Sequence, residues 1–356
     1  MHGTLPAARD GKADDRACRI AIRAGSKSFH AASMLLPRQT RRSALALYAF
    51  CRVSDDLVDD GGLAPKSGAA TDQLDARLTR IYAGNPIDHP ADRAFAAAVE
   101  RHGIPRALPQ ALIEGFEWDE AGRSYETIGA LHEYGARVAA SVGAMMTLAM
   151  GIRDPIALAR ACDLGLAMQL TNIARDVGED ARNGRLYLPR SWMREVGIDP
   201  DRFLDDPRHC ERIGEVIARV LEEAQRLYLR SATGIATLPR PCRTAIGAAL
   251  AIYRDIGREI AKANHDSIAQ RAVTSRNRKI ALALAAVPWR FANRPVDRSP
   301  PMPQVRHLVD AVNEVPAPQP INRSDGGMGR FMILMTDLDG RVGTDLAARV
   351  RERSDA

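Results

Sequence analysis

The segment 40–60 of the chain reads TRRSALALYAFCRVSDDLVDD, and it decides the fold class. Helix-forming residues fill it, and the pair Gly61-Gly62 directly after it is a strong stop signal. A period of 3.6 residues sorts its side chains into a mainly apolar stripe and a polar stripe. The first consists of Leu47, Phe50, Ser54 and Leu57, and the second of Tyr48, Arg52, Asp55 and Asp59.

The composition of the whole chain agrees with a helical protein. Its 356 residues are 46% hydrophobic and 26% charged, which excludes a disordered or low-complexity chain, while aromatic residues make up only 5%. No alternating apolar and polar run of useful length predicts a strand. We expect an all-α fold, with a small-residue-rich helix over 130–150 whose neighbours approach closely and a second long helix over 157–182.

The order of segments predicts one large domain between two tails. We expect a flexible N-terminus over residues 1–16, one all-α domain over 17–292, and a proline-rich linker and C-terminal tail over 293–356. The prolines after Pro288 are expected to break every regular element. The five dispersed cysteines, and the absence of a signal peptide or a long apolar run, predict a cytoplasmic protein.

Carboxylates are concentrated at the end of the first helix. Asp55, Asp56, Asp59 and Asp60 lie within six residues, and Asp55 and Asp59 are i,i+4 neighbours that repel each other. A divalent cation held together with substrate phosphates would compensate this repulsion. A solvated acidic helix end explains this cluster, taken alone, equally well.

A second polar stripe runs along the otherwise apolar segment QLTNIARDVGED. Gln169, Asn172, Asp176 and Asp180 follow one another at steps of three, four and four residues. Apolar residues surround the stripe, so we expect it to face an interior cavity, where amides and acids need hydrogen bonds or a metal.

Together the two clusters predict a metal-dependent diphosphate site. Two Asp-x-x-x-Asp helices facing each other across a pocket could hold divalent ions between carboxylates and diphosphate oxygens. Such a site would ionise an allylic diphosphate, and an apolar cavity would shelter the carbocation from water. Arg52 and Arg175 are candidates for diphosphate contact, although Arg175 could equally pair with Glu179 on the helix surface.

Four motifs resemble the squalene/phytoene synthase family, and the bacterial phytoene synthases most. They are Ser26-Lys27-Ser28-Phe29, Tyr48 to Asp59, the stretch from Gln169 to Asp180 with GRLYLP after it, and Ile252-Tyr253-Arg254 with Arg271-Ala272-Val273. A fifth stretch, Tyr134 to Gly143, is similar to a further motif of the family. The resemblance covers residues from about 17 to about 290.

The resemblance implies a single isoprenoid-synthase helical domain around a central cavity. It also implies a prenyltransferase of carotenoid biosynthesis that joins two geranylgeranyl diphosphates head to head, through prephytoene diphosphate, to phytoene with release of diphosphate. The cofactor implied is Mg²⁺, with Mn²⁺ as an alternative, and no NADPH is expected.

The matched motifs imply roles for individual residues of this chain. Asp55, Asp59, Asp176 and Asp180 are implied metal-binding and catalytic residues, and Tyr134 is implied to steer the cation. Substrate contacts are implied for Ser26, Ser28, Tyr48, Arg52, Gln169, Asn172, Arg175, Tyr253 and Arg271.

Three alternatives stay open at this point. A dehydrosqualene or squalene synthase that uses farnesyl diphosphate would keep the same motifs. A scaffold that binds prenyl lipids without catalysis, or a nucleic-acid-binding helical module suggested by the net charge of +6, would belong to another class. The nucleic-acid-binding module is disfavoured because a buried acidic stripe without metal would repel phosphate, so no nucleic acid is expected as a partner.

The chemistry of a forty-carbon hydrocarbon product suggests a bilayer as its destination. We therefore expect peripheral contact with the inner face of the membrane, through the Arg-rich surface and the apolar segment 331–334, and downstream carotenoid enzymes as partners.

Overall fold

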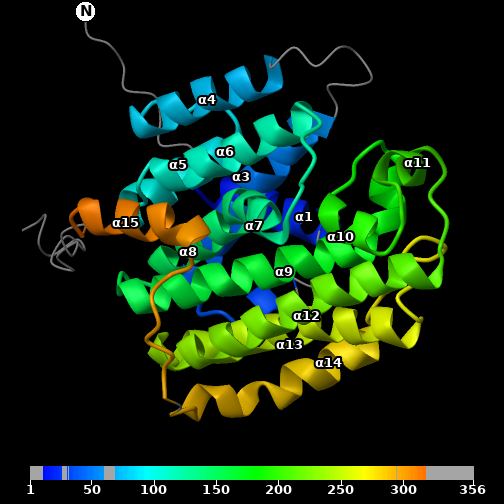
Figure 1. Ribbon diagram of the computed structural model, residues 1–356. Coiled ribbons are helices and arrows are strands. Elements are labelled where there is room, and N and C mark those ends of the chain that lie inside the picture. The colour runs from blue at the N-terminus through cyan, green and yellow to red at the C-terminus, as the bar shows by residue number, and fades with distance from the viewer. Residues whose placement is uncertain (1–10, 26–29, 31, 60–68, 294, 318–356) are drawn as a thin grey trace, which may run out of the picture. The chain divides into compact units, whose positions relative to one another are not determined.

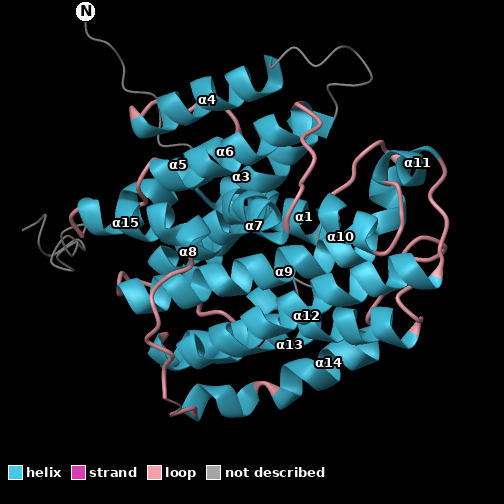
Figure 2. Cartoon of the chain, in the orientation of Figure 1, coloured by secondary structure: helices cyan, strands magenta, loops and turns pink. Residues whose placement is uncertain are grey.

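The computed structural model describes residues 11–25, 30, 32–59, 69–293 and 295–317, and every regular element in these ranges is a helix (Figure 2). The α-helices are α1 (Gly11–Gly25), α3 (Arg38–Asp59), α4 (Ala69–Tyr82), α5 (Pro90–His102), α6 (Ala107–Glu120), α7 (Ile128–Gly135), α8 (Ser141–Ala149), α9 (Pro155–Arg182), α10 (Arg190–Glu195), α11 (Pro200–Asp205), α12 (Glu211–Gly234), α13 (Arg240–Lys262), α14 (Arg276–Ala285) and α15 (Arg306–Glu314). Four short helices complete them: η1 (Ala136–Ala140), η2 (Ile235–Thr237), η3 (Val287–Phe291) and η4 (Pro303–Val305). The predicted all-α fold class is confirmed.

Helix α9 forms the centre of the domain. The Asp154 carboxylate caps its start by accepting a hydrogen bond from the Ala157 backbone N at 2.8 Å, and Pro155 occupies the first turn. Its 28 residues span about 42 Å. Helices α8, α12, α13 and α15 pack around it, and Figure 1 shows it running through the middle of the bundle.

Small residues bring the chain over 136–149 unusually close to α9. A Cβ atom added to Gly165 would lie 2.6 Å from the carbonyl oxygen of Ala139, and one added to Gly143 would lie 2.6 Å from that of Ala161. The predicted close approach is thus confirmed. The predicted single helix over 130–150 is instead divided into α7, the π-helical turn η1 and α8.

Helix α3 buries the apolar stripe that its sequence predicts. Leu47, Phe50 and Ser54 are buried, and the Phe50 ring stacks on Phe95 of α5 with 4.2 Å between centroids. On another side of α3, Leu45 and Ala49 pack in a small cluster with α1. These contacts fix the helix that ends in the first acidic cluster.

The chain after Pro288 is more ordered than its prolines predict. Helix α15 buries Leu308, Val309 and Val312 against α6, α8 and α9, so the expectation that no regular element follows Pro288 is wrong for 306–314. The reason is spacing: an amphipathic segment fits between Pro303, which starts η4, and Pro316. Chain contacts group Met1–Ala317 as one compact unit, and the end of the all-α domain at residue 292 stays a prediction.

Protonation of one half-buried histidine, His102, should destabilise the fold in mild acid. The His102 ring lies 2.8 Å from the Ser43 hydroxyl, and burial, assisted by Arg101, lowers its pKa from 6.5 to about 4. Because the folded state binds this proton less readily than the unfolded state, neutral His102 contributes to the free energy of unfolding. That contribution is fully present above pH 6.5 and is lost as the pH falls through about 4.

The free energy of unfolding should decrease between pH 7.5 and pH 4, and His102→Gln should make that decrease smaller by on the order of 1–2 kcal/mol. Urea unfolding at several pH values in this range measures it. Equal losses in the native chain and the variant would contradict the assignment.

Candidate active site

The polar stripe of α9 does face an interior cavity. Gln169 and Asn172 lie among its lining residues, and Tyr253 of α13 lies opposite them. The remaining lining is mostly apolar, with residues from η1, α8, α9, α12, η2 and α13, and Thr147, Arg160 and Ser231 are its other polar members. The expectation of a cavity beside the stripe is confirmed for these two amides.

Two arginines bind the carboxylate of Asp176, the acid that follows Asn172 in the polar stripe of α9. Arg175 Nε and Nη2 lie 2.8 and 2.7 Å from the two Asp176 carboxylate oxygens, and Arg271 Nε and Nη2 lie 2.7 and 3.1 Å from the same pair. Burial opposes ionisation of Asp176, but these hydrogen bonds outweigh it and lower its pKa. Arg175 therefore bonds Asp176, and it is Arg271 that approaches Glu179, at 3.6 Å.

Asp180, one helical turn after Asp176, lacks such partners among the described residues. Its carboxylate makes no hydrogen bond or ion pair in the described part of the chain. Burial raises its pKa to about 7, the charges of Asp176, Glu179 and Asp119 add to the rise, and Arg185 opposes it. A half-buried oxygen donor surrounded by acids suits a hard divalent cation, so the residues present fit the metal that the resemblance implies.

A tyrosine–aspartate network lies beside these acids. Tyr134 and Tyr187 both donate hydrogen bonds to the Asp119 carboxylate, at 2.8 and 2.7 Å, and their rings stack with 5.1 Å between centroids. Asp119 is also close enough to influence the charge of Asp180. Asp119 and Tyr187 were missed as site residues. The motif GRLYLP contains Tyr187 and could have indicated it, whereas no sequence signal marks Asp119, at the end of α6.

The end of α3 contributes the other predicted cluster. Arg52 Nη1 lies 3.0 Å from Asp55 and Nη2 lies 2.5 Å from Asp56. Tyr48, one turn earlier, is half-buried, and burial raises its pKa to about 12, with Arg52 opposing and Tyr253 adding to the rise. The structure thus brings Tyr48 and Tyr253, from α3 and α13, into electrostatic range of each other.

Some predicted site residues cannot be placed. Ser26, Ser28 and Asp60 lie outside the described residues, and Asp59 is described only as part of the α3 backbone. Among the side chains that are described, no three acids, histidines or cysteines are arranged as a ready ligand set. The metal-binding roles of Asp55, Asp59, Asp176 and Asp180 therefore remain predictions.

Comparison with known proteins is consistent with this arrangement. A family model described as squalene/phytoene synthase matches residues 22–279. A phytoene synthase of Rhodobacter capsulatus is 54% identical over 305 residues, which are 84% of this chain and 90% of that protein. A phytoene synthase of Cereibacter sphaeroides is 53% identical over 313 residues, which are 84% of this chain and 88% of that protein.

A solved structure shares the fold. The crystal structure of a dehydrosqualene synthase in complex with ligand superimposes with a TM-score of 0.70 at 30% identity, covering 78% of this chain and 96% of the other. The family model spans well over half of the chain, and both relatives exceed half identity over most of their own length. The chain therefore belongs to the squalene/phytoene synthase family.

Proposed function

We propose that the chain is a phytoene synthase, which joins two geranylgeranyl diphosphates head to head, through prephytoene diphosphate, to phytoene and diphosphate. As a member of its family it is a prenyltransferase-type enzyme, and two relatives that are more than half identical to it carry the name phytoene synthase. The observation that carries the proposal is the arrangement along α9, where a long apolar cavity ends at two amides and then at two carboxylates.

The family depends on divalent metal, and for this chain we propose Mg²⁺, with Mn²⁺ as the alternative and no NADPH. Asp55, Asp59, Asp176 and Asp180 would hold it. The bound ion would stabilise the negative charge of the departing diphosphate. The acidic neighbours of Asp180 support this assignment, because a bound cation would offset their repulsion of its carboxylate.

The remaining polar residues are proposed to bind and orient the substrates. Arg52, Arg175 and Arg271, which now bond carboxylates, would turn their guanidinium groups toward diphosphate oxygens. The apolar lining would exclude water from the carbocation. The negative Asp119, which accepts hydrogen bonds from Tyr134 and Tyr187, would stabilise positive charge near the acids of α9. Substrate contacts of Ser26, Ser28, Tyr48, Gln169, Asn172 and Tyr253 belong to the same proposal.

The substrate is tested directly by product analysis. Purified protein incubated with geranylgeranyl diphosphate and Mg²⁺, without nicotinamide, should release phytoene, identified by chromatography and mass. Dehydrosqualene from farnesyl diphosphate, with geranylgeranyl diphosphate left unused, would keep the mechanism and overturn the proposed chain length.

Neutralising the clamped carboxylate should abolish turnover without unfolding the chain. Asp176→Asn removes the charge that metal and arginines share, so kcat should fall by about 100-fold or more, while the far-UV circular dichroism stays native. Asp205→Asn on the exposed surface of α11 is the matched control. Similar kcat values for the two variants would sink the role proposed for Asp176.

Peripheral membrane contact is a second part of the proposal, and a surface of α14 and η3 favours it. Ile280, Leu284, Val287 and Phe291 follow a helical spacing and are 51%, 67%, 46% and 74% exposed. The sequence from 267 to 296 has six Lys or Arg residues and no Asp or Glu. Figure 1 shows α14 at an outer edge of the bundle, beyond α13. An exposed apolar stripe flanked by basic residues is complementary to an anionic bilayer.

No helix in the described ranges is long and apolar enough to cross a bilayer. The segment 331–334, expected from the sequence to take part in membrane contact, lies outside the described residues. We propose the cytoplasmic face of the membrane as the place of contact.

Charge on the stripe should detach the protein from vesicles. In flotation with vesicles containing phosphatidylglycerol, the double variant Leu284→Glu/Phe291→Glu should lose most of the bound fraction, by about tenfold. Leu229→Glu, at a 58% exposed position of α12, is the control and should float like the native chain. Equal flotation of the double variant and the native protein would place the contact elsewhere.

A further inference from the structure

The inner end of the cavity is built around a fully buried arginine. The chain over 135–150 runs antiparallel to α9, since Gly135 meets Leu166, Gly165 meets Ala139, and Gly143 meets Ala161. The lining residues of α9 therefore extend from Asn172, at the end toward Asp176, to Ala157 and Arg160 at the other end. Arg160 has only 1% of its surface exposed.

Arg160 is one of four charged side chains, two basic and two acidic, that contact one another. Its Nε lies 3.0 Å from Asp163, which is itself fully buried, and its Nη1 lies 3.0 Å from the Asp297 carboxylate. Arg230 approaches both acids, with its Nε at 3.3 Å from Asp163 and at 3.9 Å from Asp297. Neither oxygen of Asp163 accepts a well-aligned hydrogen bond from a described group, so its attraction to the two arginines is electrostatic. Losing one member would leave buried charge uncompensated.

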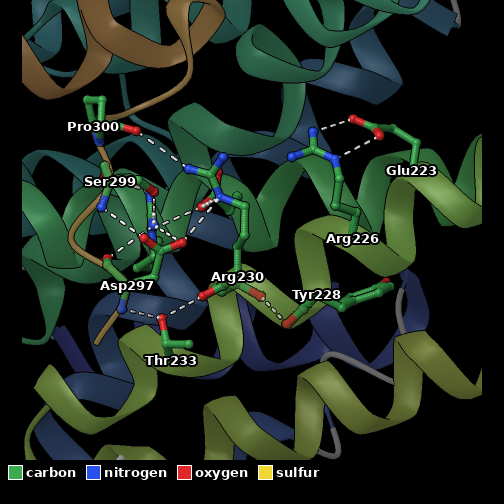
Figure 3. A network of polar contacts seen from close by, with 11 residues as sticks. Glu223, Arg226, Tyr228, Arg230, Thr233, Asp297, Ser299 and Pro300 are labelled. Atoms are coloured by element: carbon green, nitrogen blue, oxygen red, sulfur yellow. Dashed lines mark hydrogen bonds and ion pairs between the residues drawn. The ribbon is translucent and has the colours of Figure 1, made fainter. Parts of the chain in front are cut away.

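The second acid comes from a segment that passes across the outside of this end. The segment 295–301, after η3, crosses the ends of α9 and α12, and Figure 3 shows Asp297, Ser299 and Pro300 of it turned toward Arg230. Arg160 donates to the Asp297 carbonyl at 3.1 Å and to the Ser299 carbonyl at 3.2 Å. The Asp297 backbone N donates to Thr233 at 3.1 Å. The segment 295–301 itself lies beyond residue 279, where the family match ends.

The fixed guanidinium leaves the aliphatic stem of Arg160 as a wall of the cavity. A Cβ atom added to Gly234 of α12 would lie 2.3 Å from the Cβ of Arg160, so the stem rests directly on bare backbone. Leu238 and Ile235 line the cavity beside it. We call Arg160, Gly234 and Leu238 the cavity floor.

The distance from acids to floor suits one chain length. Sixteen residues of α9 separate Asp176 from Arg160, which is about 24 Å along the axis. An extended geranylgeranyl chain with its first phosphate oxygens spans roughly the same length, at about 1.25 Å per bond. One isoprene unit adds about 5 Å, close to one turn of helix. A floor displaced by one turn would therefore distinguish prenyl chains that differ by one unit.

We propose that the Arg160–Asp163–Arg230–Asp297 network fixes the cavity floor and thereby sets the longest prenyl chain that the enzyme accepts. Asp297 and Ser299 are positioning residues in this proposal, because they act through Arg160. The proposal rests on the proposed prenyltransferase function, but the floor is tested by binding as well as by turnover.

The position of the floor is tested by adding bulk above it. Ala161, one residue after Arg160, lines the cavity, and Ala161→Leu should shorten the space by part of one isoprene unit. The probes are the unreactive thiodiphosphate analogues of farnesyl, geranylgeranyl and geranylfarnesyl diphosphate, titrated calorimetrically with Mg²⁺. The ratio of geranylgeranyl to farnesyl affinity should fall by about tenfold or more. Ala97→Leu, on the exposed side of α5, is the control.

The role of the network is tested by releasing the outer segment. Asp297→Ala removes the charge that balances Arg160 and Arg230, so the native preference for the geranylgeranyl over the longer geranylfarnesyl probe should fall by about tenfold. Asp297→Asn also removes the charge but keeps one oxygen acceptor, for either Arg160 or the Ser299 backbone N, and should restore only part of that preference.

Each outcome bears on one proposal or the other. Unchanged affinity ratios in both Ala161→Leu and Asp297→Ala overturn the floor, and so does an equal loss of affinity for all three probes, which indicates general damage. Length-dependent binding without any hydrocarbon product from geranylgeranyl or farnesyl diphosphate would leave the floor standing and overturn the proposed reaction instead.

Discussion

The structure depends on the placement of carboxylates on a helix that is otherwise buried. A carboxylate loses hydration in such a place and must gain a cation or hydrogen bonds in return. Asp176 has both, from Arg175 of its own helix and from Arg271 on the loop after α13. Asp180 makes no hydrogen bond or ion pair in the described chain, and burial together with its acidic neighbours raises its pKa. The site is therefore assembled around negative charge that the protein alone only partly compensates.

This constraint explains the packing near the site. A helix that carries acids can belong to the core only if its other faces bury apolar surface. Helix α9 buries such surface on the face that lines the cavity and on the face that packs against α8. Glycines at 143 and 165 let α8 and η1 approach so closely that backbone meets backbone. The cavity lies between these closely packed elements and α12, η2 and α13. The polar network of Asp119, Tyr134 and Tyr187 then surrounds the acids on the α7 side.

Helical periodicity made most of the fold and the main stripe of the site predictable. The spacing of Gln169, Asn172, Asp176 and Asp180 specifies a common helix face wherever the helix packs, and the long helix over 157–182 follows from its apolar runs. Asp119 and the pairing of Arg271 with Asp176 were not predictable, because they join residues distant in sequence through tertiary contacts. The helix over 306–314 was not predicted because the flanking prolines were given more weight than its three apolar positions, which are buried only through contacts with α6, α8 and α9.

Placing diphosphate chemistry and cavity floor on one helix has a mechanical consequence. The rise of 1.5 Å per residue fixes the separation of Asp176 and Arg160 at about 24 Å, and a helix buried along its length cannot easily stretch or bend to change it. Chain length is then measured against a rigid distance rather than against a flexible pocket. The floor needs support from outside α9, since an arginine at a cavity end would otherwise move toward water, and the segment 295–301 supplies that support. Substrate selection thus depends on a stretch that lies beyond the part of the chain shared with the family model.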